Sequence, residues 1–95
     1  MSKTTCFIRL DTQTLRRLHS LKEDNLHGEA YQLAAQALEL PGLVDTFTRI
    51  NRDHNRAGWL TPELDADRRS AYEKLLAKAR KLLTEEQYNQ LYMCF

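Results

Sequence analysis

The sequence predicts an all-α fold, a compact single domain of four or five short helices over residues 1–95 that begins with a short extended segment, residues 4–10. Three observations support this prediction. The chain of 95 residues is one domain long. Its three Gly and two Pro provide too few turns for a β-sandwich or barrel. Its apolar residues recur mostly at three- and four-residue steps, which is the spacing of an amphipathic helix.

The first quarter of the chain predicts an extended segment followed by a helix. In residues 4–10 apolar side chains occupy every second position, as in a strand, with Phe7 as the exception. Asp11 can cap a helix that starts directly after it, because its carboxylate can accept a hydrogen bond from the first turn. Leucines spaced three residues apart continue this helix to about Asp24.

The next two predicted helices are separated by a Pro-Gly pair. Ala and Leu residues recur at helical spacing from Glu29, and Pro41 and Gly42 are expected to end that helix. A third helix is expected from about Leu43. It should end at Gly58, because glycine readily adopts the left-handed conformation that turns the chain out of a helix.

The C-terminal third predicts two helices. Thr61 and Pro62 form a start signal, since the hydroxyl can cap the helix and proline has no N–H to leave unpaired in its first turn. The apolar stripe of this helix, expected to be the longest, changes phase at Thr84. Thr84 and Gln87 have the spacing of a capping box, so we expect a separate fifth helix after this position.

Charge and cysteine content favour a cytoplasmic protein without a cofactor. Fourteen basic and thirteen acidic residues give a net charge of +1, which is too small to attract a polyanion to the whole molecule. The sequence has no apolar run long enough to span a membrane or to form a signal peptide. Cys6 and Cys94 belong to no CxxC pair or Cys/His cluster, so no metal site is expected.

An alternating segment that leads into two Leu- and Ala-rich helices occupies residues 5–40. The relevant residues are Ile8-Arg9-Leu10-Asp11, then Leu15, Leu18 and Leu21, then Leu33, Ala37 and Leu38. In this order of elements the segment resembles the ribbon-helix-helix repressors, whose strands pair across a homodimer and place outward side chains in the DNA major groove. The resemblance implies a dimeric DNA-binding regulator that uses Lys3, Thr5, Arg9, Arg16 and Arg17.

A second local pattern lies in residues 53–64. Asp53 and Gly58 occupy the first and sixth positions of a twelve-residue segment that resembles an EF-hand calcium loop. Leu64, however, stands at the twelfth position, where the loop needs a bidentate glutamate. We therefore expect a connector between two helices and no metal binding.

Catalytic motifs are missing from the sequence, so a non-enzymatic protein is expected. The three histidines lie in three different predicted elements, and the sequence has no glycine-rich phosphate loop or nucleophile elbow. The leading hypothesis is a small cytosolic protein-protein interaction or regulatory module whose partner the sequence does not identify. The alternative is the dimeric DNA-binding regulator.

Two sets of residues are candidates for binding a protein partner, because Tyr, Trp and Arg are enriched where proteins meet. The first set consists of Arg49, Arg52, Arg56 and Trp59, whose arginines share one helix face. The second set consists of Tyr88, Tyr92 and Phe95. Each set has a structural alternative, namely a solvated face for the arginines and closure of the core for the C-terminal aromatic residues.

Overall fold

The computed structural model describes residues 10–95, which form five helices and no strand. The helices are α1 (Thr12–Glu23), α2 (His27–Ala37), α3 (Pro41–Ala57), α4 (Pro62–Leu82) and α5 (Glu85–Tyr92). The predicted all-α fold is thus confirmed. Of the extended segment predicted over residues 4–10, all but Leu10 lies outside the described residues.

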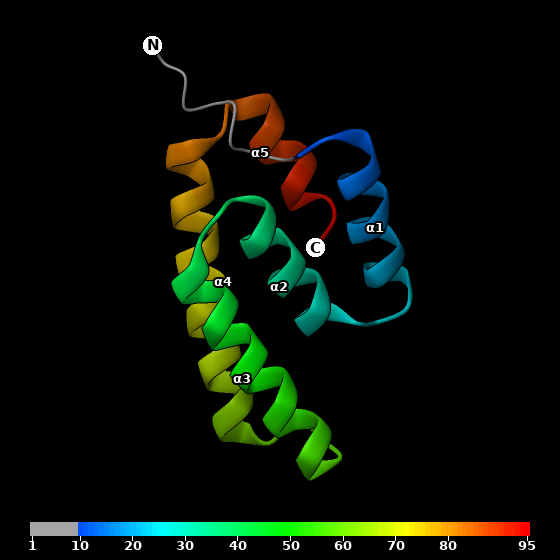
Figure 1. Ribbon diagram of the computed structural model, residues 1–95, viewed down its shortest axis with the longest axis vertical. Coiled ribbons are helices and arrows are strands. Elements are labelled where there is room, and N and C mark those ends of the chain that lie inside the picture. The colour runs from blue at the N-terminus through cyan, green and yellow to red at the C-terminus, as the bar shows by residue number, and fades with distance from the viewer. Residues whose placement is uncertain (1–9) are drawn as a thin grey trace.

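A long helical hairpin forms the axis of the molecule. α3 and α4 run antiparallel, and the tip of this hairpin extends beyond the other helices (Figure 1). α1, α2 and α5 gather around the opposite end, which gives extents of 45 × 24 × 16 Å. α2 is the central element, because it packs against α1, α3 and α4.

Local side-chain hydrogen bonds begin three of the helices at the predicted positions. Oδ1 of Asp11 accepts a hydrogen bond of 2.8 Å from the first turn of α1, and Oγ1 of Thr61 accepts one of 3.2 Å from the first turn of α4. The backbone N–H of Thr84 donates to Oε1 of Gln87 at 3.1 Å, and the backbone N–H of Gln87 donates to Oγ1 of Thr84 at 3.2 Å. These two bonds confirm the capping box and the break before α5. Gly58 ends α3 with φ at 83°, as predicted.

The junction of α2 and α3 differs from the prediction. α2 ends at Ala37, before the Pro-Gly pair, and Pro41 is instead the first residue of α3. Glu39 has a left-handed backbone with φ at 57°, so this non-glycine residue provides the turn. The prediction was wrong because left-handed geometry is rare for glutamate and has no sequence signature, whereas proline is well suited to the first helical position.

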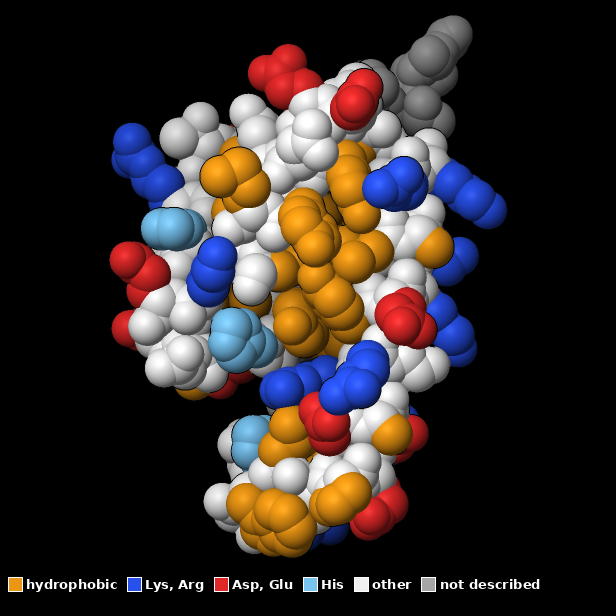
Figure 2. All heavy atoms as spheres, turned by 180° about the vertical axis from the view of Figure 1, so that it is seen from behind, with side chains coloured by type: hydrophobic (Ala, Val, Ile, Leu, Met, Phe, Trp, Pro, Cys, Tyr) orange, Lys and Arg blue, Asp and Glu red, His pale blue; other side chains and the backbone are white. Residues whose placement is uncertain are grey.

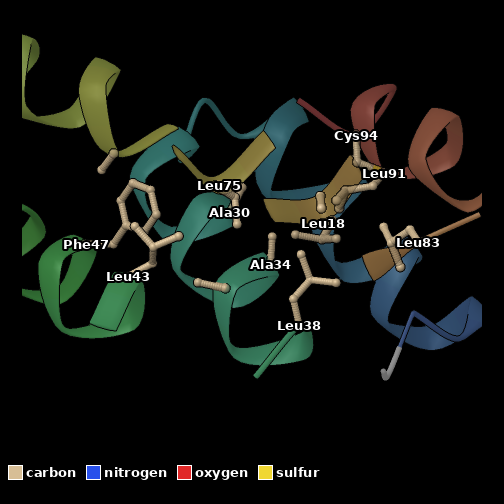
Figure 3. Packing of buried hydrophobic residues seen from close by; sticks show 13 residues of the cluster. Leu18, Ala30, Ala34, Leu38, Leu43, Phe47, Leu75, Leu83, Leu91 and Cys94 are labelled. Carbon is tan, nitrogen blue, oxygen red and sulfur yellow. The ribbon is translucent and has the colours of Figure 1, made fainter. Parts of the chain in front are cut away.

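The hydrophobic core surrounds α2 (Figure 3). α2 contributes small side chains, with Ala34 and Ala35 completely buried. Each of the other four helices contributes large side chains that are completely buried. These are Leu18 of α1, Phe47 and Ile50 of α3, Leu75 of α4 and Leu91 of α5.

We predict that a larger side chain at Ala34 destabilises the fold. Ala34→Leu inserts additional carbon atoms at a completely buried position, and overpacking of this kind lowers the free energy of unfolding by about 1–3 kcal/mol. Ala77→Leu is a matched control, because Ala77 is an exposed residue of α4. Urea unfolding followed by circular dichroism measures both variants, and equal midpoints would contradict the prediction.

Candidate functional site

All four tyrosines of the chain gather with the C-terminal phenylalanine in one region. Tyr31 belongs to α2, Tyr72 to α4, and Tyr88 and Tyr92 to α5, while Phe95 is the last residue. We term these five residues the aromatic surface. The space-filling view shows a continuous apolar area bordered by Lys and Arg side chains and also by His and acidic side chains (Figure 2).

Three rings of the aromatic surface hold one another in place. The ring centroids of Tyr31 and Tyr72 are 4.7 Å apart, and Phe95 meets these two rings edge to face at 5.2 and 5.6 Å. Such tilted and edge-to-face pairs are the favoured arrangements of aromatic rings. Tyr31 also lies 5.7 Å from the ring of the buried Phe47, so the rings are connected to the core.

The other two rings form a stacked pair on α5. Tyr88 and Tyr92 have centroids 6.2 Å apart and planes inclined by 18°. The guanidinium carbon of Arg80 lies 4.9 Å from the centre of the Tyr88 ring, which is a cation-π contact between α4 and α5. Tyr92 is 54% exposed, so it offers a large aromatic face to solvent.

The phenol groups at the centre of the aromatic surface are held in their neutral form. Burial raises the pKa of Tyr72 to about 12, and the neighbouring phenols of Tyr31, Tyr92 and Tyr88 contribute to the increase. Burial also raises the pKa of Tyr31, although the positive charge of Arg68 opposes this effect. Both hydroxyls are protonated at neutral pH, as ordinary tyrosines are, and can donate hydrogen bonds; the raised pKa extends this state to more alkaline pH.

A pocket of about 230 Å³ opens beside the aromatic surface, and its walls are Tyr31, Asp65, Arg68, Arg69 and Tyr72. Nη2 of Arg69 donates to Oδ2 of Asp65 at 3.2 Å, so these two charges offset each other. Arg68 is half-buried and forms no ion pair with any described residue. The Arg68 guanidinium thus provides the unpaired charge of the pocket.

The predicted C-terminal set is divided between the core and the surface. Leu91 and Cys94 are buried, whereas Tyr88 and Phe95 are half-buried against the core and Tyr92 is largely exposed. All three predicted residues belong to the aromatic surface. The same segment therefore contributes both to the core and to the exposed surface.

The predicted arginine set lies elsewhere. Arg49 and Arg52 approach carboxylate oxygens of α4 and α3 at 3.9 and 3.4 Å, and both side chains are exposed. Arg56 is exposed, and Trp59 is 59% exposed at the tip of the hairpin. This tip is at the end of the hairpin opposite α5 (Figure 1), so the structure does not join the two predicted sets into one site.

The residues of the DNA-binding alternative are only partly described. Lys3, Thr5 and Arg9 lie outside the described residues, and Arg16 and Arg17 are exposed on α1. The DNA-binding hypothesis stays a prediction.

Three members of the site were missed from the sequence. Tyr31 stands three and four residues before the buried Ala34 and Ala35 and so shares their face of α2, and Tyr72 belongs to the apolar stripe of the long helix. Both positions indicate core packing and not a surface site. Arg68 is one of many charged residues of α4. Only the convergence of α2, α4 and α5 distinguishes these residues from their neighbours.

The segment that resembles a calcium loop is mostly helical. Asp53 belongs to α3 and Leu64 to α4, and only residues 58–61 connect the two helices. Within residues 10–95, no three His, Cys, Asp or Glu side chains converge as metal ligands. In the same part of the chain, no helix combines the length and apolar character needed to cross a membrane.

We predict that stability falls between pH 10 and 12. The unfolded chain ionises Tyr72 near pH 10, whereas the folded protein ionises it only at about 12. The contribution of neutral Tyr72 is therefore complete below pH 10 and is lost as the pH rises through 12. Urea unfolding at several pH values should show a shallower decline for Tyr72→Phe than for the wild-type protein, and identical declines would contradict this prediction.

Comparison with known proteins provides no relative for this chain. No family model matches it, and searches of curated proteins and of solved structures also give no match. A function is therefore proposed from the chemistry of the aromatic surface.

Proposed function

We propose that the protein is a small, non-enzymatic interaction or regulatory module that binds a protein partner through its aromatic surface. The main support is the gathering of all four tyrosines and Phe95 from α2, α4 and the C-terminal segment. Tyrosine offers a large apolar area and a hydroxyl with few rotatable bonds, and it is enriched among residues that dominate binding energy.

The rigidity of the aromatic surface supports this function. Tyr31 and Tyr72 are fixed by each other, by Phe95 and by the core residue Phe47. Side chains already ordered before binding lose little entropy when a partner arrives, so more of the contact energy remains as affinity. The surface therefore resembles a preorganised binding site more than a set of mobile side chains.

The exposed edge of the surface provides contact area. Tyr92 is 54% exposed and the adjacent Met93 is 73% exposed. Methionine adapts its shape to an apolar partner because it is unbranched and flexible. A fixed aromatic centre with an adaptable edge is suited to binding an apolar face of another protein.

A cytoplasmic location is part of the same proposal. Cys94 is a free, buried thiol, and burial raises its pKa, so it remains protonated and poorly reactive. A free thiol of this kind is typical of proteins in a reducing compartment, where disulfides rarely form. The proposal involves no cofactor.

A peptide-display selection tests the proposal. Peptides selected on the wild-type protein should bind Tyr92→Ala at least about tenfold more weakly, because truncation of an aromatic residue that dominates an interface costs about 2 kcal/mol or more, and about 1.4 kcal/mol corresponds to tenfold in affinity. Fluorescence anisotropy with the selected peptides measures this change.

The matched control is Trp59→Ala, since Trp59 is a similarly exposed aromatic residue at the tip of the hairpin. The proposal requires unchanged peptide affinity in this variant. Failure to select any peptide, or an affinity that depends on Trp59 and is unaffected at Tyr92, would contradict it.

A further inference from the structure

We infer that the aromatic surface binds an acidic amphipathic helix of its partner, and that one carboxylate of this helix enters the pocket at Arg68. The inference rests on the proposed function and specifies its partner class. It is supported by the unpaired charge in the pocket, by the arrangement of charge along α4 and by the apolar area between the charges.

The pocket has the chemistry of a carboxylate site. Arg68 is half-buried and without an ion-pair partner in the described chain, although the other arginine of the pocket, Arg69, is neutralised by Asp65. A guanidinium can donate two parallel hydrogen bonds to one carboxylate, and partial burial strengthens them. The neutral phenols of Tyr31 and Tyr72 line the same pocket and add potential donors.

The size of the pocket also fits this occupant. A volume of about 230 Å³ is sufficient for an Asp or Glu side chain but is below the usual range of small-molecule sites. The pocket adjoins the aromatic surface through Tyr31 and Tyr72, which belong to both. A residue that follows the bound carboxylate along a peptide therefore reaches the aromatic rings directly.

On α4, one arginine precedes and another follows the tyrosine of the aromatic surface. Arg68, Tyr72, Leu76 and Arg80 follow one another at four-residue steps, so each neighbours the next in a row that turns by about 120° around the helix between the two arginines. The rise of an α-helix places the two arginines about 18 Å apart. A partner helix of about three turns, with an acidic residue at each end of an apolar stripe, matches both the charges and the distance.

A third positive group lies near the C-terminus. Nζ of Lys22 in α1 donates a hydrogen bond of 3.1 Å to the carbonyl oxygen of Met93. This ammonium group is held beside the exposed Met93 at the edge of the surface. The charge around the apolar area is thus positive at Lys22, Arg68 and Arg80, which favours an acidic partner.

Single-stranded nucleic acid is the competing occupant, because aromatic rings and arginines also bind stacked bases. The overall net charge of +1 argues against it, since nucleic-acid binding depends strongly on the total positive charge. Leu76 and Met93 also provide an apolar area that a phosphate backbone would not cover. The acidic helix is therefore the occupant that the surface fits best.

The test uses a display library of helix-biased 16-residue peptides selected on the wild-type protein. The selected peptides are expected to carry Asp or Glu at both ends of an apolar stripe. Arg68→Gln should weaken the best peptide at least tenfold in fluorescence anisotropy. Replacing the corresponding Glu of the peptide by Gln should cause the same loss, and combining both changes should cause little further loss, because the two groups form one interaction.

Two further variants provide the controls. Arg52→Gln, on the exposed side of α3, should leave peptide affinity unchanged. Arg68→Lys keeps the charge but not the paired donors, so its affinity should lie between those of the wild-type protein and Arg68→Gln. Far-UV circular dichroism verifies that each variant is folded.

Failure of this inference is distinguishable from failure of the proposed function. Selected peptides without acidic residues, or full peptide affinity in Arg68→Gln, would overturn the inference. In that case a loss of peptide affinity in Tyr92→Ala would still support a protein-binding surface. Absence of any peptide that depends on Tyr92 would overturn both. A fifteen-residue oligothymidine that binds more tightly than every selected peptide, and that loses affinity in Arg68→Gln, would assign the pocket to nucleic acid.

Discussion

The small side chains of α2 are the constraint on which the rest of the structure depends. Ala30, Ala34 and Ala35 are buried, so the neighbouring helices pack closely around α2. Close packing of this kind leaves no room for larger residues, because protein interiors have the density of organic crystals. It also brings Tyr31, next to Ala30 in sequence, within 4.7 Å of the ring of Tyr72 on α4. The aromatic surface is thus a direct consequence of the core.

The C-terminal segment contributes to both the core and the surface. Leu91 is completely buried, whereas the next residue, Tyr92, is largely exposed, because consecutive side chains on a helix point about 100° apart. Beyond α5, the thiol of Cys94 lies 3.7 Å from the carbonyl oxygen of Leu15 in α1 and 3.3 Å from that of Gln90 in α5, and its single proton can form a weak hydrogen bond to either oxygen. These contacts hold Phe95 against the tyrosine rings. The C-terminal segment therefore provides both core residues and the most exposed part of the aromatic surface.

Arginines with similar sequence context differ in their tertiary environment. Arg49 and Arg52 are exposed beside carboxylates, where ion pairs contribute little free energy. Arg68 is half-buried beside two phenols and has no acidic partner among the described residues. A charge that the fold itself does not neutralise can interact with a ligand at full strength. This difference in environment separates a candidate binding residue from a solvated one.

Four or five helices, and most of the ends of the five that form, could be predicted from the residues alone, because caps such as Asp11, Thr61 and Thr84 act over three residues and helical periodicity is local. It failed at Glu39, whose left-handed backbone has no local signature. Three of the five residues of the aromatic surface were foreseen, as the C-terminal set. The packing of the helices was needed to show that Tyr31 and Tyr72 belong to this surface and that Arg68 lines the pocket beside it. Periodicity within one helix cannot specify which residues meet across helices.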